Sequence, residues 1–74
     1  MNKLILILNE IDSTIDFASE TGIIDKELID SLQLMELISE LEEAFDITIE
    51  MEEIIPGNFN SANAMWEMIT RLQG

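Results

Sequence analysis

Residues 30–45 have the most constraining pattern in this chain of 74 residues. Apolar side chains recur along the segment every three or four positions, the spacing of a helix with one buried face: Leu34, Leu37, Ile38, Leu41 and Phe45. Asp30 can cap the start of this helix, and Gln33, three residues later, can complete a capping box. Glutamates occupy most of the opposite side. The segment therefore predicts an amphipathic helix around which the rest of the chain must fold.

Two further segments have helical spacing. Residues 2–16 place apolar side chains at positions 4, 7, 8, 11 and 15. A last helix, capped by Asn60 or Ser61, places them at positions 62, 65, 66, 69 and 72. Residues 4–8 alone would fit a buried strand, but no other segment offers a partner strand. Residues 51–55 can form a single helical turn, which Pro56-Gly57 would then stop.

The connecting segments also contribute to the predicted core. Residues 17–29, with a turn at Thr21-Gly22, are expected to form a long loop held to the core by apolar residues, and such loops are often functional. The isoleucines of the connector at 46–49 can turn inward, and Phe45 and Trp66 are assigned to the core. The prediction is an all-α fold, a small four-helix bundle with three main helices and one short helix, forming a single domain over residues 1–74.

The charge balance excludes several classes of function. The chain has 16 Asp and Glu against 3 Lys and Arg, a net charge of −13, and neither His nor Cys. It therefore lacks the residues for Cys/His zinc sites, Ser-His-Asp or Cys-His catalysis and disulfides, and we predict neither an enzyme nor a metal site. Nucleic-acid phosphates would be repelled. The hydrophobic fraction of 47% argues against disorder. Because the apolar run at 4–8 is too short for a bilayer or a signal sequence, we expect no membrane insertion and a cytoplasmic location.

Ser31 is the residue best placed to accept chemistry from elsewhere. A phosphate on its oxygen would lie beside the free N–H groups and the positive dipole end of the predicted helix, although a serine here usually has only a capping role. Its neighbours add specificity. Three stretches closely resemble the core of the acyl carrier protein family: Ile29-Asp30-Ser31-Leu32, Met35-Glu36-Leu37, and the Leu41–Ile47 stretch Leu-Glu-Glu-Ala-Phe-Asp-Ile. The predicted order of elements also resembles that family over essentially the whole chain.

This resemblance implies a function and its residues. Ser31 would bear a 4′-phosphopantetheine arm, transferred from coenzyme A by a Mg²⁺-dependent phosphopantetheinyl transferase, and acyl or aminoacyl groups would be carried on the arm as thioesters. Asp30 and Leu32 would complete the cofactor-binding site, with Asp30 also contacting the transferase. Leu32, Met35, Glu36, Glu40 and Glu43 would contact partners with basic patches: the transferase, an acyl- or aminoacyl-activating ligase, and a downstream transferase or synthase. The carrier is expected to be a monomer.

Several alternatives remain open at this stage. Met35 could be spare core packing, and the glutamates could be an ordinary solvated helix face. Leu28-Ile29 replaces the Gly-Ala typical of fatty acid carriers, so the chain looks more like D-alanyl carriers or stand-alone peptide and polyketide carriers, and the cargo stays open. The competing function is an unmodified acidic helical module that mimics nucleic-acid charge. Calcium sensing is set aside, because neither acidic segment has the glycine that an EF-hand loop requires.

Overall fold

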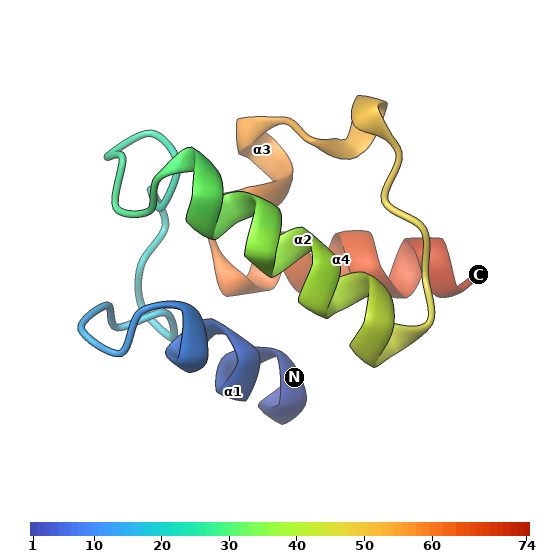
Figure 1. Ribbon diagram of the computed structural model, residues 1–74, viewed down its shortest axis with the longest axis horizontal. Coiled ribbons are helices and arrows are strands. Elements are labelled where there is room, and N and C mark those ends of the chain that lie inside the picture. Colours follow the sequence, from blue (N-terminus) through green and yellow to red (C-terminus); the bar gives the residue numbers. More distant parts are fainter.

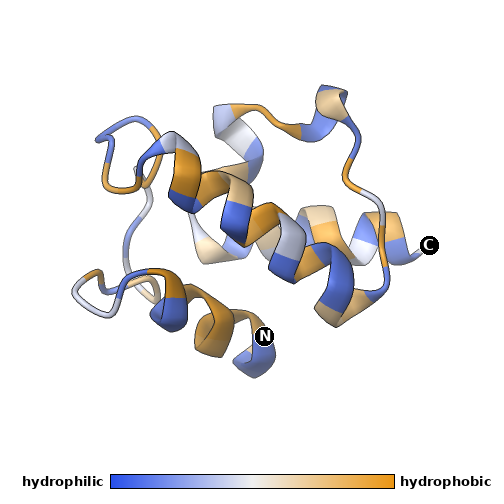
Figure 2. Ribbon diagram, viewed as in Figure 1, coloured by the Kyte–Doolittle hydropathy of each residue, from blue (hydrophilic) through white to orange (hydrophobic).

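The computed structural model describes all residues 1–74, and all of its regular secondary structure is helical, as predicted. Three helices dominate, α1 (Asn2–Ile11), α2 (Ser31–Phe45) and α4 (Ala62–Gln73), and a short helix, α3 (Pro56–Phe59), precedes the last of them. α2 crosses the molecule, with α1 along one side of it and α4 behind (Figure 1). Hydrophobic and hydrophilic residues alternate along α2, as expected for a helix with one buried face (Figure 2). None of the helices is long and apolar enough to cross a bilayer.

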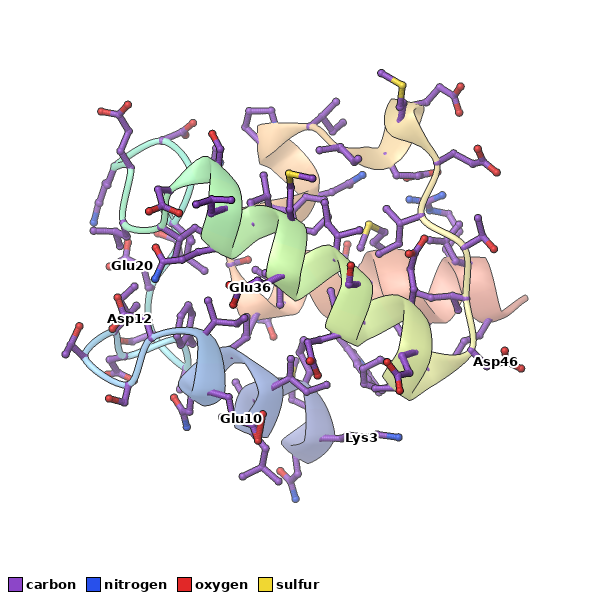
Figure 3. All side chains as sticks on the ribbon, in the orientation of Figure 1. Lys3, Glu10, Asp12, Glu20, Glu36 and Asp46 are labelled. Atoms are coloured by element: carbon purple, nitrogen blue, oxygen red, sulfur yellow. The ribbon has the colours of Figure 1, made fainter.

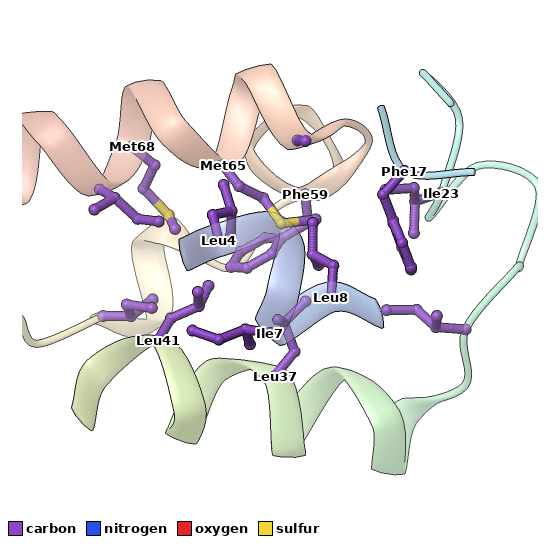
Figure 4. Packing of buried hydrophobic residues seen from close by; sticks show 14 of the residues in the cluster. Leu4, Ile7, Leu8, Phe17, Ile23, Leu37, Leu41, Phe59, Met65 and Met68 are labelled. Atoms are coloured by element: carbon purple, nitrogen blue, oxygen red, sulfur yellow. The ribbon is translucent and has the colours of Figure 1, made fainter. Parts of the chain in front are cut away.

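One cluster of 15 buried hydrophobic residues forms the core. Leu4, Ile7 and Leu8 of α1 lie between α2 and α4, as Figure 4 shows. α2 contributes Leu37 and Leu41, both fully buried. Ile47 and Ile49 of the connector also turn inward, which confirms that prediction. Phe45 and Trp66 are only half-buried: their rings meet edge to face at 5.9 Å at the margin of the core rather than within it.

Two predicted helix boundaries were wrong. α1 ends at Ile11 rather than continuing to residue 16, because the Asp12 carboxylate accepts hydrogen bonds from the backbone N–H and the hydroxyl of Thr14, at 2.9 and 2.6 Å. This local turn competes with helical hydrogen bonding. Ile15 still packs against the core from outside the helix.

The segment around Pro56 also differs from the prediction. Residues 51–55 do contain the predicted single helical turn, the 3₁₀ turn η1 (Met51–Glu53), but Pro56 begins α3 instead of stopping a helix. Proline suits the first position of a helix because its missing N–H would have no partner there. The η1 turn is joined to α4 by Arg71, which donates hydrogen bonds of 2.6 and 2.8 Å to Glu53. These bonds lower the pKa of the Glu53 carboxyl.

All three basic side chains are engaged within the molecule. Lys26 forms an ion pair with Glu20 at 2.9 Å, and Arg71 forms one with Glu53. Lys3 donates to the carbonyl oxygen of Ala44 at 2.7 Å, at the negative end of α2, and lies over the Phe45 ring. Most of the 16 acidic side chains therefore have no counter-charge within the chain.

We expect salt to stabilise this fold. Raising NaCl from about 10 mM to about 150 mM shortens the screening length from about 30 Å to about 8 Å and weakens the repulsion among the carboxylates. The melting temperature, followed by far-UV circular dichroism, should rise by several degrees. A melting temperature that stays flat or falls over this range would contradict the expectation.

Candidate functional site

Ser31 is the first residue of α2, and its side chain is exposed. The helix begins here because the predicted capping box is present. The Asp30 carboxylate accepts the backbone N–H of Gln33 at 2.8 Å, and the Gln33 side chain accepts the backbone N–H of Asp30 at 3.0 Å. Gln33 also donates to the carbonyl oxygen of Ile11 at 3.4 Å, which joins the start of α2 to the end of α1. The position of Ser31 is thereby fixed relative to two helices.

The long loop before Ser31 contains a helical turn of its own. The Leu28 N–H donates to the carbonyl of Ile23, and the Glu27 N–H donates to that of Ile24. Glu27 adopts the left-handed conformation, with φ of 54°. This combination is a Schellman motif, the usual way to close a helical turn. The loop therefore arrives at Ser31 with a defined backbone, and buried Ile23 and Ile29 attach it to the core as predicted.

Asn60 holds this loop against the junction between α3 and α4. Its side-chain oxygen accepts the backbone N–H groups of Ile24 and Asp25 at 2.9 and 3.0 Å. Its side-chain nitrogen donates to Asp25 at 3.1 Å, and its carbonyl accepts from the Ile23 N–H at 2.9 Å. Ser61, not Asn60, caps α4 by accepting the N–H of Ala64. Sequence analysis offered Asn60 only as a possible cap and missed its role in positioning the loop.

Replacing Asn60 with alanine is expected to destabilise the fold by about 1–3 kcal/mol, because two backbone N–H groups lose their acceptor. Asn63→Ala is the matched control, since Asn63 is an exposed residue in the first turn of α4. Urea unfolding gives the free energy of unfolding of both variants. Equal stability of the two would contradict the anchoring role of Asn60.

The surroundings of Ser31 suit a phosphate ester. The Asp30 side chain and carbonyl accept hydrogen bonds from the backbone N–H groups of Gln33 and Leu34. The N–H groups of Ser31 and Leu32 are therefore free for an external acceptor. These groups lie at the positive end of a helix of 15 residues. A hollow of about 380 Å³ opens beside the serine, lined by Ile24, Glu27, Ile29, Asp30, Ser31 and Leu34. Exposed oxygen, free donors and open space together fit the attachment of a phosphate-linked arm.

The other predicted site residues all lie along the exposed side of α2. Leu32 is 72% exposed and Met35 is 65% exposed, so Met35 is not spare core packing. Glu36, Glu40 and Glu43 are exposed as well. The structure brings Asp30, Ser31 and Leu32 together at the helix start. Glu43 lies twelve residues further on, about 18 Å along the axis at about 1.5 Å per residue, so it is remote from the serine.

No group of three or more His, Cys, Asp or Glu side chains is arranged to hold a metal ion. Glu42 is one of the glutamates that the sequence pattern places away from the apolar face of α2, but it has a structural role. Its carboxylate accepts the backbone N–H of Ile49 at 2.8 Å and so holds the connector after α2.

Comparison with known proteins agrees with this geometry. Residues 6–69 match the protein family described as "Phosphopantetheine attachment site". The chain is also similar to the D-alanyl carrier protein of Streptococcus mutans, with 39% identity over 54 residues, which cover 73% of this chain and 68% of that protein. No solved structure matches the chain.

Proposed function

The chain belongs to the phosphopantetheine-binding family of acyl carrier proteins, and from this premise we propose that Ser31 is the residue that bears its prosthetic group. Members of this family carry covalently attached 4′-phosphopantetheine and are carriers rather than catalysts. The observation that carries the proposal is the position of Ser31: exposed, first in α2, and beside two free backbone donors and an open hollow.

Apart from the Ser31 hydroxyl, attachment of the arm would require no reactive group from this chain. With a phosphopantetheinyl transferase and Mg²⁺, the Ser31 oxygen would form a bond to phosphorus of coenzyme A as the pyrophosphate P–O bond breaks. Adenosine bisphosphate would leave with the bonding electron pair, and the hydroxyl proton would pass to the transferase. The capping box of Asp30 and Gln33 would keep the backbone at Ser31 in a fixed position during this step. Once bound, the group supplies a thiol that holds cargo as a thioester, so the chain needs no cysteine of its own.

Partner enzymes would contact the exposed side of α2. Leu32 and Met35 offer apolar surface, and Glu36, Glu40 and Glu43 offer carboxylates for basic patches on a transferase, a ligase and a downstream synthase. The exposure of both apolar side chains supports this role, because they contribute nothing to the core. We further propose that the chain works as a monomer, as one carrier domain over residues 1–74, in the cytoplasm.

D-alanine is the first cargo to test. The curated relative is a D-alanyl carrier protein, and the apolar pair Leu28-Ile29 before Asp30 differs from the fatty acid carriers. A D-alanine-activating ligase with ATP should load the protein once it carries the arm, and a larger fraction of the protein should be loaded with D-alanine than with L-alanine or acetate. Preferential loading by an acyl-activating ligase would instead favour an acyl cargo.

The decisive experiment is an intact-mass measurement. The protein is incubated with coenzyme A, Mg²⁺ and a broad-specificity phosphopantetheinyl transferase, with a reaction lacking coenzyme A as control. The expected result is the addition of one phosphopantetheinyl group. No gain with several different transferases would contradict the proposal and would favour the unmodified acidic module that mimics nucleic-acid charge.

A further inference from the structure

Residues 50–58, which comprise η1 and most of α3, are attached to the rest of the chain at few points. None of their side chains is buried, and Met51 is 84% exposed. The backbone hydrogen bonds that they make stay within residues 50–60. Figure 1 shows the segment as an arch between α2 and α4. Because segments with few buried contacts open at a low cost in free energy, the contacts that do hold this one decide its position.

One cluster of side chains, Arg71, Glu53 and Asn58, fastens the segment. The Arg71 guanidinium donates to both oxygens of the Glu53 carboxylate, at 2.6 and 2.8 Å. The Asn58 side-chain nitrogen donates to the same carboxylate at 3.1 Å and to the Glu53 carbonyl at 2.8 Å. No other hydrogen bond or ion pair joins residues 50–58 to the rest of the chain. We call this cluster the latch.

The segment forms one wall of a small apolar pocket of about 70 Å³. The lining residues are Ile24, Leu34, Ile54, Ile55, Pro56 and Phe59. Three of these directly follow Glu53 in the sequence, so the latch fixes their place. Ile24 and Leu34, from outside the segment, also line the hollow beside Ser31. The pocket therefore adjoins the proposed attachment site, and its size depends on where residues 54–56 lie.

The volume of the pocket limits what it can bury. A dry apolar cavity that binds benzene has a volume of about 150 Å³. This pocket has less than half of that volume, so it has room only for a group of a few atoms. A longer apolar group can enter only if residues 54–56 move away from Ile24 and Leu34. The pair between Arg71 and Glu53 opposes that movement.

We propose that Arg71 determines specificity by keeping this pocket closed through the latch. While the latch holds, the chain cannot bury an apolar group longer than a few atoms beside Ser31. Release of Arg71 from Glu53 lets the segment move and enlarges the pocket. The consequence for cargo rests on the proposed function: a small or polar cargo does not need the pocket, and a long apolar cargo stays exposed to water. The latch itself does not depend on the prosthetic group.

The test measures binding of hexanol to the protein without its arm. Hexanol has one more non-hydrogen atom than benzene, and it is neutral, so the net charge of the chain does not affect its binding. Titration into protein with ¹³C-labelled isoleucine and leucine methyl groups is followed by NMR. Hexanol binding requires the open pocket, so its affinity is proportional to the population of the open state. The affected signals should be those of Ile24, Leu34, Ile54 and Ile55.

Arg71→Met removes the ion pair and keeps a side chain of similar length. It should tighten hexanol binding about two- to fivefold, because an exposed ion pair changes the population of the open state by about this factor. Arg71→Lys, which retains a positive charge beside Glu53, should bind hexanol less tightly than Arg71→Met. Lys3→Met is the matched control, since it also removes one positive charge and Lys3 lies on α1, away from residues 50–58 (Figure 3). Equal affinity of Arg71→Met and the unaltered protein, or equal tightening by Lys3→Met, would overturn the proposal.

Amide hydrogen exchange provides a second measurement that needs no probe. The backbone N–H groups of Ile54, Ile55 and Asn58 are hydrogen-bonded within the segment. Their exchange should be about two- to fivefold faster in Arg71→Met, and unchanged in Lys3→Met, if the latch holds the segment. Exchange that is the same in both variants would overturn the proposal. Neither measurement involves the arm, so failure of the latch and failure of the mass experiment on Ser31 are distinguishable.

Discussion

Replacement of Ser31 by alanine is expected to abolish phosphopantetheinylation and leave the fold intact. The variant removes the only atom proposed to attack coenzyme A, so intact-mass spectra should show no added group at any reaction time. Stability should change by less than about 0.5 kcal/mol, because the side chain is exposed and the capping box is made by Asp30 and Gln33. Thermal melts of the same samples provide this second measurement.

Two further variants make the Ser31 result specific. Ser39→Ala changes another exposed serine of α2 and should be modified as fully as the unaltered protein. Asp30→Ala removes the helix cap and should cost about 1 kcal/mol of stability, which separates the effect of a damaged helix start from that of a missing nucleophile. Modification of Ser31→Ala protein would assign the prosthetic group to a different hydroxyl.

Replacement of Phe59 by alanine should have the largest effect on stability. Phe59 is 1% exposed and packs in the core near Met65 (Figure 4). Truncating a buried phenylalanine costs about 3–5 kcal/mol, a large part of the roughly 4–11 kcal/mol expected for 74 residues. Urea unfolding should therefore show a protein that is marginally folded at best.

Met51→Ala is the control for this core variant. Met51 is 84% exposed, so losing its side chain should change the unfolding free energy by about 0.5 kcal/mol or less. A loss below about 1 kcal/mol for Phe59→Ala would mean that the core does not close around this ring as the structure describes.

Sequence analysis predicted helix α2 and its cap correctly because the information is local. The capping pair is three residues apart, and the apolar repeat of α2 continues over four turns. The helix boundaries near Asp12 and Pro56 each depend on which of two local conformations is more stable. Asp12 can continue a helix or form a turn with Thr14, and Pro56 can end a helix or begin one. The apolar pattern does not decide between them.

In the candidate site, too, some residues could be predicted from local sequence and others only from the folded structure. Asp30, Ser31 and Leu32 were identified from consecutive residues, and the structure places them together at the start of α2. The role of Asn60 depends on backbone groups 35 and 36 positions away, which no local pattern encodes. Glu10 was likewise passed over, because it lines a groove between α1 and α2 that follows only from the packing of these two helices.

The contacts of Asn60 also have a mechanical consequence. An arm attached at Ser31, as proposed, would pull on the start of α2 and on the loop that leads to it when an enzyme held the arm. The hydrogen bonds from Ile23, Ile24 and Asp25 to Asn60 carry that load to the junction of α3 and α4. The loop before Ser31 is thus anchored to a segment near the other end of the sequence, and a force on the proposed arm would be resisted by the α3–α4 junction as well as by the loop itself.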